Sequence, residues 1–185
     1  MAVALSLLFE GAAADAVRAV WAALAEAGES RDMLELQYPP HLTLMVAEDE
    51  GFMPILVERF AGLAPLVPDA LGLDEVRQFE GTSVTWVSCG DDPGLGRLHA
   101  AAAGLLPADA IHPHYRPGVW TPHVTLALNG KAQSLLDRAR AKWTKGVPAR
   151  ISRLEVARFP PAETLAGIDL CEKASLEGMS EALRP

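Results

Sequence analysis

One five-residue pattern occurs twice in this chain, and it constrains the fold more than any other feature of the sequence. Residues 40–44 read Pro-His-Leu-Thr-Leu, and residues 122–126 read Pro-His-Val-Thr-Leu. Both copies lie in apolar segments typical of strands, where a histidine and a threonine are unusual. Internal repetition of this kind indicates a fold assembled from similar units. The sequence therefore predicts two related halves, each of which positions one histidine and one threonine.

Hydrophobic patterning predicts a similar order of elements around both copies. In the first half we expect a strand, a helix, the first motif strand, a helix and two further strands at residues 2–9, 12–27, 33–47, 48–63, 70–79 and 83–89. In the second half we expect a helix capped by residues 91–94 and ending at 103, a loop at 107–118, the second motif strand, a helix at 131–143, and strands at 149–159 and 163–173. This order predicts an α+β fold of two pseudo-symmetric lobes, each an antiparallel-rich sheet with helices outside, around an active-site cleft. We expect one domain over residues 1–173 and a loose tail at 174–185.

The charge balance limits the class of partner. The 185 residues include 24 acidic and 16 basic side chains, which gives a formal net charge of −8. Proteins that grip long duplexes do so largely through many lysine and arginine contacts to phosphates. We therefore expect no long duplex nucleic acid as a partner. A nucleotide or a short nucleic-acid end fits the composition better, and we expect a monomer.

The N-terminal segment and the two cysteines are typical of a cytoplasmic protein. Residues 1–9 are apolar, but they include no basic residue and are followed at once by Glu10. We interpret them as a buried strand rather than a signal peptide or a membrane span. Cys89 and Cys171 are not spaced as a Cys-x-x-Cys motif, and we expect both to be reduced thiols.

Strand geometry turns the repeated pattern into two matched polar faces. Alternate side chains of a strand share a face, so His41 and Thr43 are expected on one side of the first copy. His123 and Thr125 are expected on the equivalent side of the second copy. In each copy the histidine and the threonine would be roughly 7 Å apart. The preceding proline removes a ladder donor and so places each motif at a strand start or edge.

Two such histidines can divide acid and base work, because imidazole titrates near neutral pH. On a phosphodiester, the neutral ring would accept a proton from the attacking oxygen, and the protonated ring would donate one to the leaving oxygen. The hydroxyls of Thr43 and Thr125 would donate hydrogen bonds to the phosphoryl oxygens. This chemistry needs neither a metal nor another cofactor. A packed or exposed His-Thr pair is the alternative for a single copy, and the duplication favours catalysis.

With these motifs the sequence resembles the two-histidine (2H) phosphoesterase superfamily, which includes 2′-5′ RNA ligase-like proteins and 2′,3′-cyclic phosphodiesterases. The resemblance rests on residues 41–44 and 123–126 and on the order of elements over residues 2–173. It implies hydrolysis of a 2′,3′-cyclic phosphate to a 2′-phosphomonoester, or the reversible 2′-5′ joining of RNA ends. It also implies that His41, Thr43, His123 and Thr125 are the catalytic residues.

The chain departs from RNA ligase-like members in the residues that follow the motifs. A basic residue often follows in those members, whereas residues 45–47 are Met-Val-Ala and residues 127–129 are Ala-Leu-Asn here. Together with the acidic charge, this favours a small nucleotide or an RNA terminus carrying a cyclic phosphate. The alternatives are 2′-5′ RNA ligase activity and a nucleotide-binding regulatory domain with little turnover.

The segment before the second motif supplies secondary candidates. Arg116 can pair with a phosphate oxygen, and Tyr115 or Trp120 can stack on a base, although a solvated loop is an equal alternative. A metal site formed by His112 and His114 with the motif histidines is a further alternative, for which no recognisable ligand spacing is present. We expect a structural role for His99. The tryptophans other than Trp120 are expected in the core, and these are Trp21, Trp86 and Trp143.

Overall fold

An antiparallel sheet forms the centre of the molecule. The computed structural model describes residues 1–130 and 133–170, and every strand pairing within them is antiparallel. The seven strands are β1 (Ala2–Glu10), β2 (His41–Ala47), β3 (Ala70–Gln78), β4 (Thr85–Cys89), β5 (His123–Ala127), β6 (Val147–Phe159) and β7 (Glu163–Asp169). Their order across the sheet is β1-β2-β5-β4-β3-β6-β7, and β1 also pairs with β6. The two motif strands, β2 and β5, are therefore neighbours.

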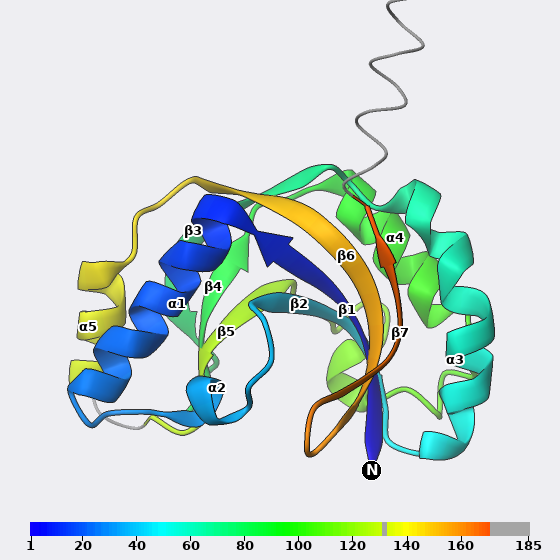
Figure 1. Ribbon diagram of the computed structural model, residues 1–185, viewed down its shortest axis with the longest axis horizontal. Coiled ribbons are helices and arrows are strands. Elements are labelled where there is room, and N and C mark those ends of the chain that lie inside the picture. Colours follow the sequence, from blue (N-terminus) through cyan, green and yellow to red (C-terminus); the bar gives the residue numbers. More distant parts are fainter. Residues whose placement is uncertain (131–132, 171–185) are drawn as a thin grey trace, which may run out of the picture.

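Strand β6 joins the two halves of the sheet. Its first residues pair with β3, and its longer remainder pairs with β1 and β7. Arg150 is the point of transfer, because it pairs with Ala70 on β3 and with Glu10 on β1. Figure 1 shows β6 as a long arch that runs across the top of the molecule. The motif strands lie beneath this arch.

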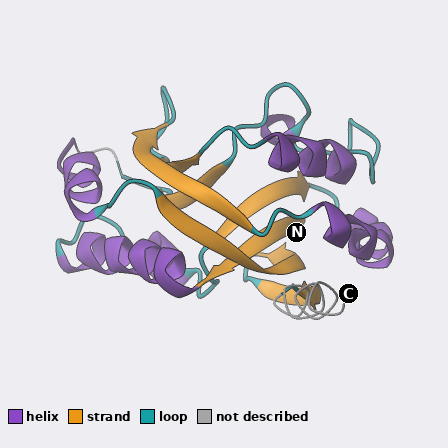
Figure 2. Cartoon of the chain, turned by 90° about the horizontal axis from the view of Figure 1, so that it is seen from above, coloured by secondary structure: helices purple, strands orange, loops and turns teal. Residues whose placement is uncertain are grey.

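The helices form two groups at opposite ends of the sheet (Figures 1 and 2). The α-helices are α1 (Gly11–Glu26), α2 (Asp32–Glu35), α3 (Met53–Arg59), α4 (Pro93–Ala103) and α5 (Gln133–Lys142), and the 3-10 helices are η1 (Glu50–Phe52), η2 (Phe60–Leu66) and η3 (Pro113–Tyr115). Helix α1 packs against β6 and α5, and α4 packs against η2 and β2. The α+β class predicted from the sequence, with an antiparallel sheet and helices outside, is confirmed.

Apolar spacing explains why these helices form where they do. The buried side chains of α1 follow a helical period, and they include Val17, Val20 and Leu24. Helix α4 begins as its sequence predicts, because the carboxylate of Asp92 accepts hydrogen bonds from the backbone N–H groups of Gly94 and Leu95 at 2.6 and 3.1 Å. The strands expected at residues 70–79 and 83–89 form β3 and β4, which pair as a hairpin with its turn at residues 80–82.

Two segments differ from the sequence prediction. Residues 33–47 were expected to be extended throughout, but the chain forms α2 first and β2 starts only at His41. The cause is a distant contact: the Asp32 carboxylate accepts hydrogen bonds from the N–H groups of Leu128 and Asn129, at 3.1 and 2.8 Å. The helix expected over residues 48–63 is divided into η1, α3 and η2. Pro54, in the first turn of α3, lacks the N–H that a continuous helix would need.

Other predictions lie partly or wholly outside the described residues. These are the tail at 174–185, the end of the strand expected to reach residue 173, and the first residues of the helix expected from 131. Within residues 1–130 and 133–170, the helices are all too short or too polar to span a membrane.

Candidate active site

The two motif strands meet at one backbone pair, Leu42 opposite Val124. Both of these side chains are fully buried, so the residues on either side of them project from the other face of the sheet. Continuing the antiparallel register by one position places His41 opposite Thr125, and Thr43 opposite His123. All four side chains are half-buried. The structure thus brings the four predicted catalytic residues together on one face.

Each motif histidine is held by the same backbone contact. Nδ1 of His41 lies 2.8 Å from the carbonyl oxygen of Pro39, and Nδ1 of His123 lies 2.8 Å from the carbonyl oxygen of Thr121. A carbonyl oxygen can only accept, so Nδ1 is the protonated nitrogen in both rings. This assignment leaves Nε2 of each neutral ring as the basic nitrogen. The prolines at positions 40 and 122 fix the turn that brings these carbonyls back to the rings.

The surroundings of the pair lower the pKa of both imidazoles. Burial is the main cause for His41 and for His123, because it disfavours the charged form. The hydrogen bond to the backbone carbonyl opposes this effect in each ring. The proximity of His123 lowers the pKa of His41 further, since two imidazolium charges repel. The site therefore favours at most one protonated ring near neutral pH.

A buried polar network lies behind His41. The ring of Tyr38 contacts His41 edge-on at 4.8 Å, and its hydroxyl donates to Oε1 of Glu155 at 2.8 Å. Glu155 is only 3% exposed and also accepts from Nε of Arg153 at 2.9 Å and from the Thr164 hydroxyl at 3.0 Å. The negative charge of Glu155 raises the pKa of His41, in opposition to burial. The network thus supports one histidine sterically and electrostatically.

An aromatic pair lies beside His123. Phe79 and Trp86 stack with ring centroids 4.6 Å apart, and both rings meet His123 edge-on, at 5.1 and 5.8 Å. Trp86 lies across the sheet from Thr125, so it belongs to the same face. Its Nε1 is buried and has no hydrogen-bond partner among the described residues. His123 therefore has a more apolar setting than His41.

Two indoles fix the backbone of the motif strands. Nε1 of Trp120 donates to the carbonyl oxygen of Thr43, and Nε1 of Trp21 donates to the carbonyl oxygen of Thr125, each at 3.1 Å. The hydroxyl of Thr43 also forms a hydrogen bond with the side chain of Tyr115. Burial raises the pKa of Tyr115, and this hydrogen bond opposes the rise. Both threonines are therefore held at defined positions beside the histidines.

The three secondary candidates serve the scaffold in this structure. Arg116 donates from Nε to the carbonyl oxygen of Ile111 at 2.9 Å, and Tyr115 contacts Thr43 as described. One face of Trp120 is covered by His99, whose ring is stacked on it at 4.0 Å and nearly parallel. Their predicted roles in binding phosphate or base stay predictions.

The remaining side chains that we singled out are structural. His99 is buried and its Nε2 lies 2.9 Å from the Tyr115 carbonyl oxygen. The three tryptophans expected in the core are buried, as the exposures of Trp21, Trp86 and Trp143 show. Cys89 is a free thiol whose pKa burial raises to about 12, and Cys171 lies outside the described residues.

The loop histidines are part of the same turn and are not joined to the motif pair. The ring of His112 accepts from the His114 N–H at 3.3 Å, and its other nitrogen lies 3.8 Å from Glu48. Among the described residues, no three His, Cys, Asp or Glu side chains are grouped so that they could hold a metal ion. The alternative of a four-histidine metal site has no support in this arrangement.

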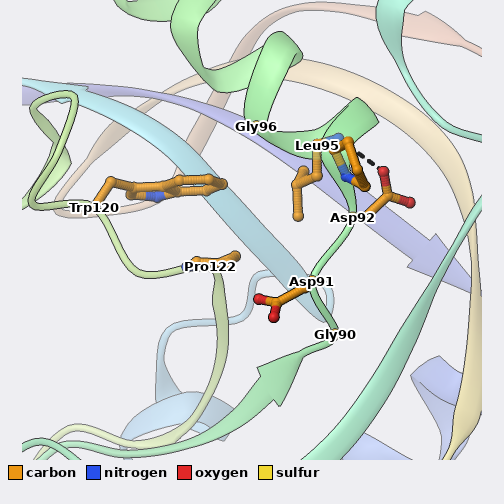
Figure 3. A pocket seen from close by; sticks show the side chains of 8 residues that line it. Gly90, Asp91, Asp92, Leu95, Gly96, Trp120 and Pro122 are labelled. Carbon is orange, nitrogen blue, oxygen red and sulfur yellow. Dashed lines mark hydrogen bonds between the residues drawn. The ribbon is translucent and has the colours of Figure 1, made fainter.

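A pocket of about 320 Å³ opens next to the second motif (Figure 3). It lies between the start of α4 and the segment that leads into β5, and Pro122, which precedes His123, forms part of its wall. Trp120 lines it as well, and the Asp91 side chain projects toward it from the β4–α4 connection.

Sequence reasoning missed Tyr38, Glu155, Phe79 and Asp91. A weak signal for Glu155 was present, because this acidic residue stands between the apolar residues Leu154 and Val156 of β6. For the others no local pattern distinguishes them, since their places depend on contacts across the sheet.

Comparison with known families agrees with this geometry. The sequence model of the 2′-5′ RNA ligase superfamily matches residues 9–160, which contain both motifs. No curated protein matched the chain in a separate search.

Solved structures of similar fold extend over nearly the whole chain. Escherichia coli LigT complexed with 3′-AMP is 15% identical and has a TM-score of 0.52, with 91% of this chain and 96% of LigT covered. LigT complexed with NADP⁺ gives the same identity and coverage and a TM-score of 0.53. A structure described as a phosphoesterase is 14% identical, with 91% and 97% covered and a TM-score of 0.52. At this identity the likeness establishes the fold.

Proposed function

Because this chain belongs to the 2′-5′ RNA ligase superfamily, we propose that it is a metal-independent phosphodiesterase that opens 2′,3′-cyclic phosphates of nucleotides or RNA ends. The product is the 2′-phosphomonoester. The reaction is acid–base catalysis by His41 and His123, with Thr43 and Thr125 as hydrogen-bond donors to the phosphoryl group.

The proposed reaction conserves protons and bonds. The neutral imidazole removes a proton from a water molecule as the water oxygen bonds to phosphorus. The P–O3′ bond breaks, and the protonated imidazole donates its proton to the departing 3′ oxygen. The enzyme ends with the two protonation states exchanged, and proton exchange with water restores them. No Lewis acid is required for these steps, because the threonine hydroxyls and the imidazolium stabilise the charge on the phosphoryl oxygens.

The observation that carries the proposal is the matched pair of histidine contacts. Both Nδ1 atoms are tied to carbonyl oxygens at 2.8 Å, on strands that are neighbours in the sheet. Two rings held in the same tautomer on one face present two equivalent Nε2 atoms. This repetition supports acid–base catalysis on two opposed oxygens, in which one ring serves each oxygen through its Nε2.

Charge favours hydrolysis of small substrates over the joining of RNA ends. The formal net charge is −8, and no basic residue follows either motif at residues 45–47 or 127–129. Arg153, in the polar network behind His41, is already paired with Glu155 and Asp169. A nucleotide is also the kind of molecule held by LigT in its complexes with 3′-AMP and NADP⁺.

The test is a direct assay of the purified chain with the four nucleoside 2′,3′-cyclic phosphates, in the presence and absence of EDTA. The proposal expects 2′-phosphomonoesters at the same rate in both conditions. Loss of activity in EDTA would contradict metal independence. Nucleotide binding without turnover would instead support the regulatory alternative, and 2′-5′-linked products from RNA ends would support ligation.

A further inference from the structure

A row of paired residues crosses the sheet from the second motif toward β3. Thr125 of β5 is paired with Trp86 of β4, and Trp86 is paired with Arg77 of β3. Directly paired residues of antiparallel strands project from the same face of the sheet. Arg77 therefore lies on the face of the motif residues, two strands from Thr125, which is about 10 Å between the two backbones. In Figure 1, β5, β4 and β3 follow one another in this order away from β2.

An aromatic surface fills the space between Arg77 and the second motif. Trp86 is stacked on Phe79, which follows Arg77 by two residues, and both rings contact His123 edge-on at 5.8 and 5.1 Å. Neither ring carries a charge that would repel a phosphate. A nucleoside can therefore extend over this surface from a phosphate at the histidines toward Arg77.

The guanidinium of Arg77 is available to a ligand. Its side chain is 54% exposed, and its Nη2 donates to Oε2 of Glu75 at 3.3 Å. Glu75 also pairs with Lys145, which interacts in turn with Asp74. The two carboxylates of this cluster are balanced by two cations, so a phosphate at Arg77 meets no excess of negative charge. A guanidinium has five N–H donors, and those not directed to Glu75 can donate to a phosphate.

The opposite side of the motif has a different balance of charge. Arg153 lies on the same face as His41, because both residues are paired with Leu8 of β1. The guanidinium of Arg153 is bonded to two carboxylates, those of Glu155 and Asp169. One cation with two anions leaves a net negative charge, which repels a phosphate. A substrate with two phosphates is therefore favoured in one direction only, with its second phosphate toward β3.

We propose that Arg77 binds a second phosphate of the substrate, on the 5′ oxygen of the nucleoside whose cyclic phosphate lies at the histidines. This inference rests on the function proposed above and narrows its substrate class. The second phosphate is either a terminal 5′-phosphate or the link to a preceding nucleotide, and both present anionic oxygens to the guanidinium. The ribose that separates the two phosphates and the long side chain of Arg77 together cover the distance between the motif and β3.

The experiment uses adenosine 2′,3′-cyclic phosphate, the same compound with a 5′-phosphate, and a dinucleotide that ends in the same cyclic phosphate. The measured quantity is kcat/KM for each phosphate-bearing compound divided by kcat/KM for the first compound. In the wild type we expect a ratio of about ten at low ionic strength, which falls as salt is added. Arg77→Gln should lower the ratio to about two or less. Arg77→Lys, which keeps the charge without the planar fork, should give an intermediate ratio.

Arg18→Gln is the matched control for the loss of charge. Arg18 lies on α1, its side chain is 52% exposed, and its Nη1 is paired with Asp15 at 3.2 Å. The substitution therefore removes the same charge and a comparable ion pair at a distant place, and it should keep the wild-type ratios. Equal losses in Arg18→Gln and Arg77→Gln would assign the preference to net charge and refute the site.

The outcomes separate the second-phosphate site from the chemistry. A preference for either phosphate-bearing compound that is lost in Arg77→Gln supports the site and identifies the source of the phosphate. Wild-type ratios near one, or ratios unchanged in Arg77→Gln, would overturn the site and leave the proposed function intact. If the wild type opens none of the three compounds, the proposed function fails, and calorimetric binding of adenosine 2′-monophosphate and adenosine 2′,5′-bisphosphate decides on the site. Tighter binding of the bisphosphate, lost in Arg77→Gln, would support it, and equal binding would refute it.

Discussion

The indole Nε1 of Trp120 donates a hydrogen bond to the carbonyl oxygen of Thr43 at 3.1 Å. The equivalent bond in the other half of the molecule joins Trp21 to Thr125 at the same distance. Strands β2 and β5 are paired at a single position, Leu42 opposite Val124. The carbonyls of Thr43 and Thr125 each follow that pair by one residue, where the pairing between the two strands ends. The two tryptophans therefore hold the motif strands from outside the sheet, although the sequence indicated only a core role for Trp21 and base stacking for Trp120.

Replacing Trp120 by phenylalanine tests this support. Trp120→Phe keeps a ring against His99 but removes the donor to Thr43, which should cost about 1 kcal/mol in the free energy of unfolding and lower kcat several-fold. Trp143→Phe is the matched control, because it removes an indole bond of 2.7 Å to the Asp74 carbonyl on β3. It should lower stability by a similar amount and leave kcat unchanged. Equal effects of the two variants on kcat would refute a local role for Trp120.

Loss of either motif histidine should disable the reaction. His41→Ala and His123→Ala are each expected to lower kcat by at least about 10², the usual scale for an acid–base group. The double variant should be little worse than either single one, because the two rings act as a unit. His114→Ala, at an exposed loop histidine, is the control and should behave as the wild type. Near-wild-type turnover in either motif variant would exclude the assigned roles.

Burial predicts an acidic optimum for the free enzyme. The pKa of both motif histidines lies below the ordinary value, so the state with one neutral and one protonated ring is most populated below about pH 6.5. The profile of kcat/KM should therefore be bell-shaped with its maximum on that side, and it should fall as pH rises because the imidazolium is lost. A bound phosphate anion raises the pKa of both rings, so the optimum of kcat should lie at higher pH. A kcat/KM maximum above about pH 7.5 would contradict the effect of burial.

Glu155 should position and tune His41 without contacting the substrate. Its charge raises the pKa of His41, so Glu155→Gln should move the kcat/KM profile to lower pH as well as reduce the rate. Tyr38→Phe, which removes the hydroxyl donated to Glu155, is a milder second variant that keeps the ring against His41. Glu163→Gln removes an exposed carboxylate paired with Arg158 and should leave the profile in place. A purely structural Glu155 would change stability alone, with no shift of the profile.

The sequence was sufficient to predict the parts of the fold that depend on the local spacing of apolar residues and on the repeated motif. Alternation placed His41, Thr43, His123 and Thr125 on one face, and the capping residue Asp92 located the start of α4. The spacing of apolar residues likewise located α1 and the β3–β4 hairpin. These features are encoded within a few residues of the chain, so no knowledge of distant contacts was needed.

Features that depend on distant contacts could not be predicted. The turn at α2 forms because Asp32 binds the backbone of Leu128 and Asn129, which no local pattern shows. The role of Trp120 likewise depends on its bond to Thr43, which is far away in the sequence. The local sequence favoured an extended segment at residues 33–47, and it suggested that Trp120 was available to stack on a base. Tertiary hydrogen bonds overrode both.

The central claim is that two histidines open a cyclic phosphate without a metal. The most direct measurement follows a nucleoside 2′,3′-cyclic phosphate by phosphorus NMR with the wild type, His41→Ala and His123→Ala, all in excess EDTA. We predict that the wild type converts the cyclic resonance to a 2′-phosphomonoester alone, and that each variant is at least about 10² slower. Unchanged cyclic phosphate with the wild type, or rapid conversion by either variant, would contradict the claim.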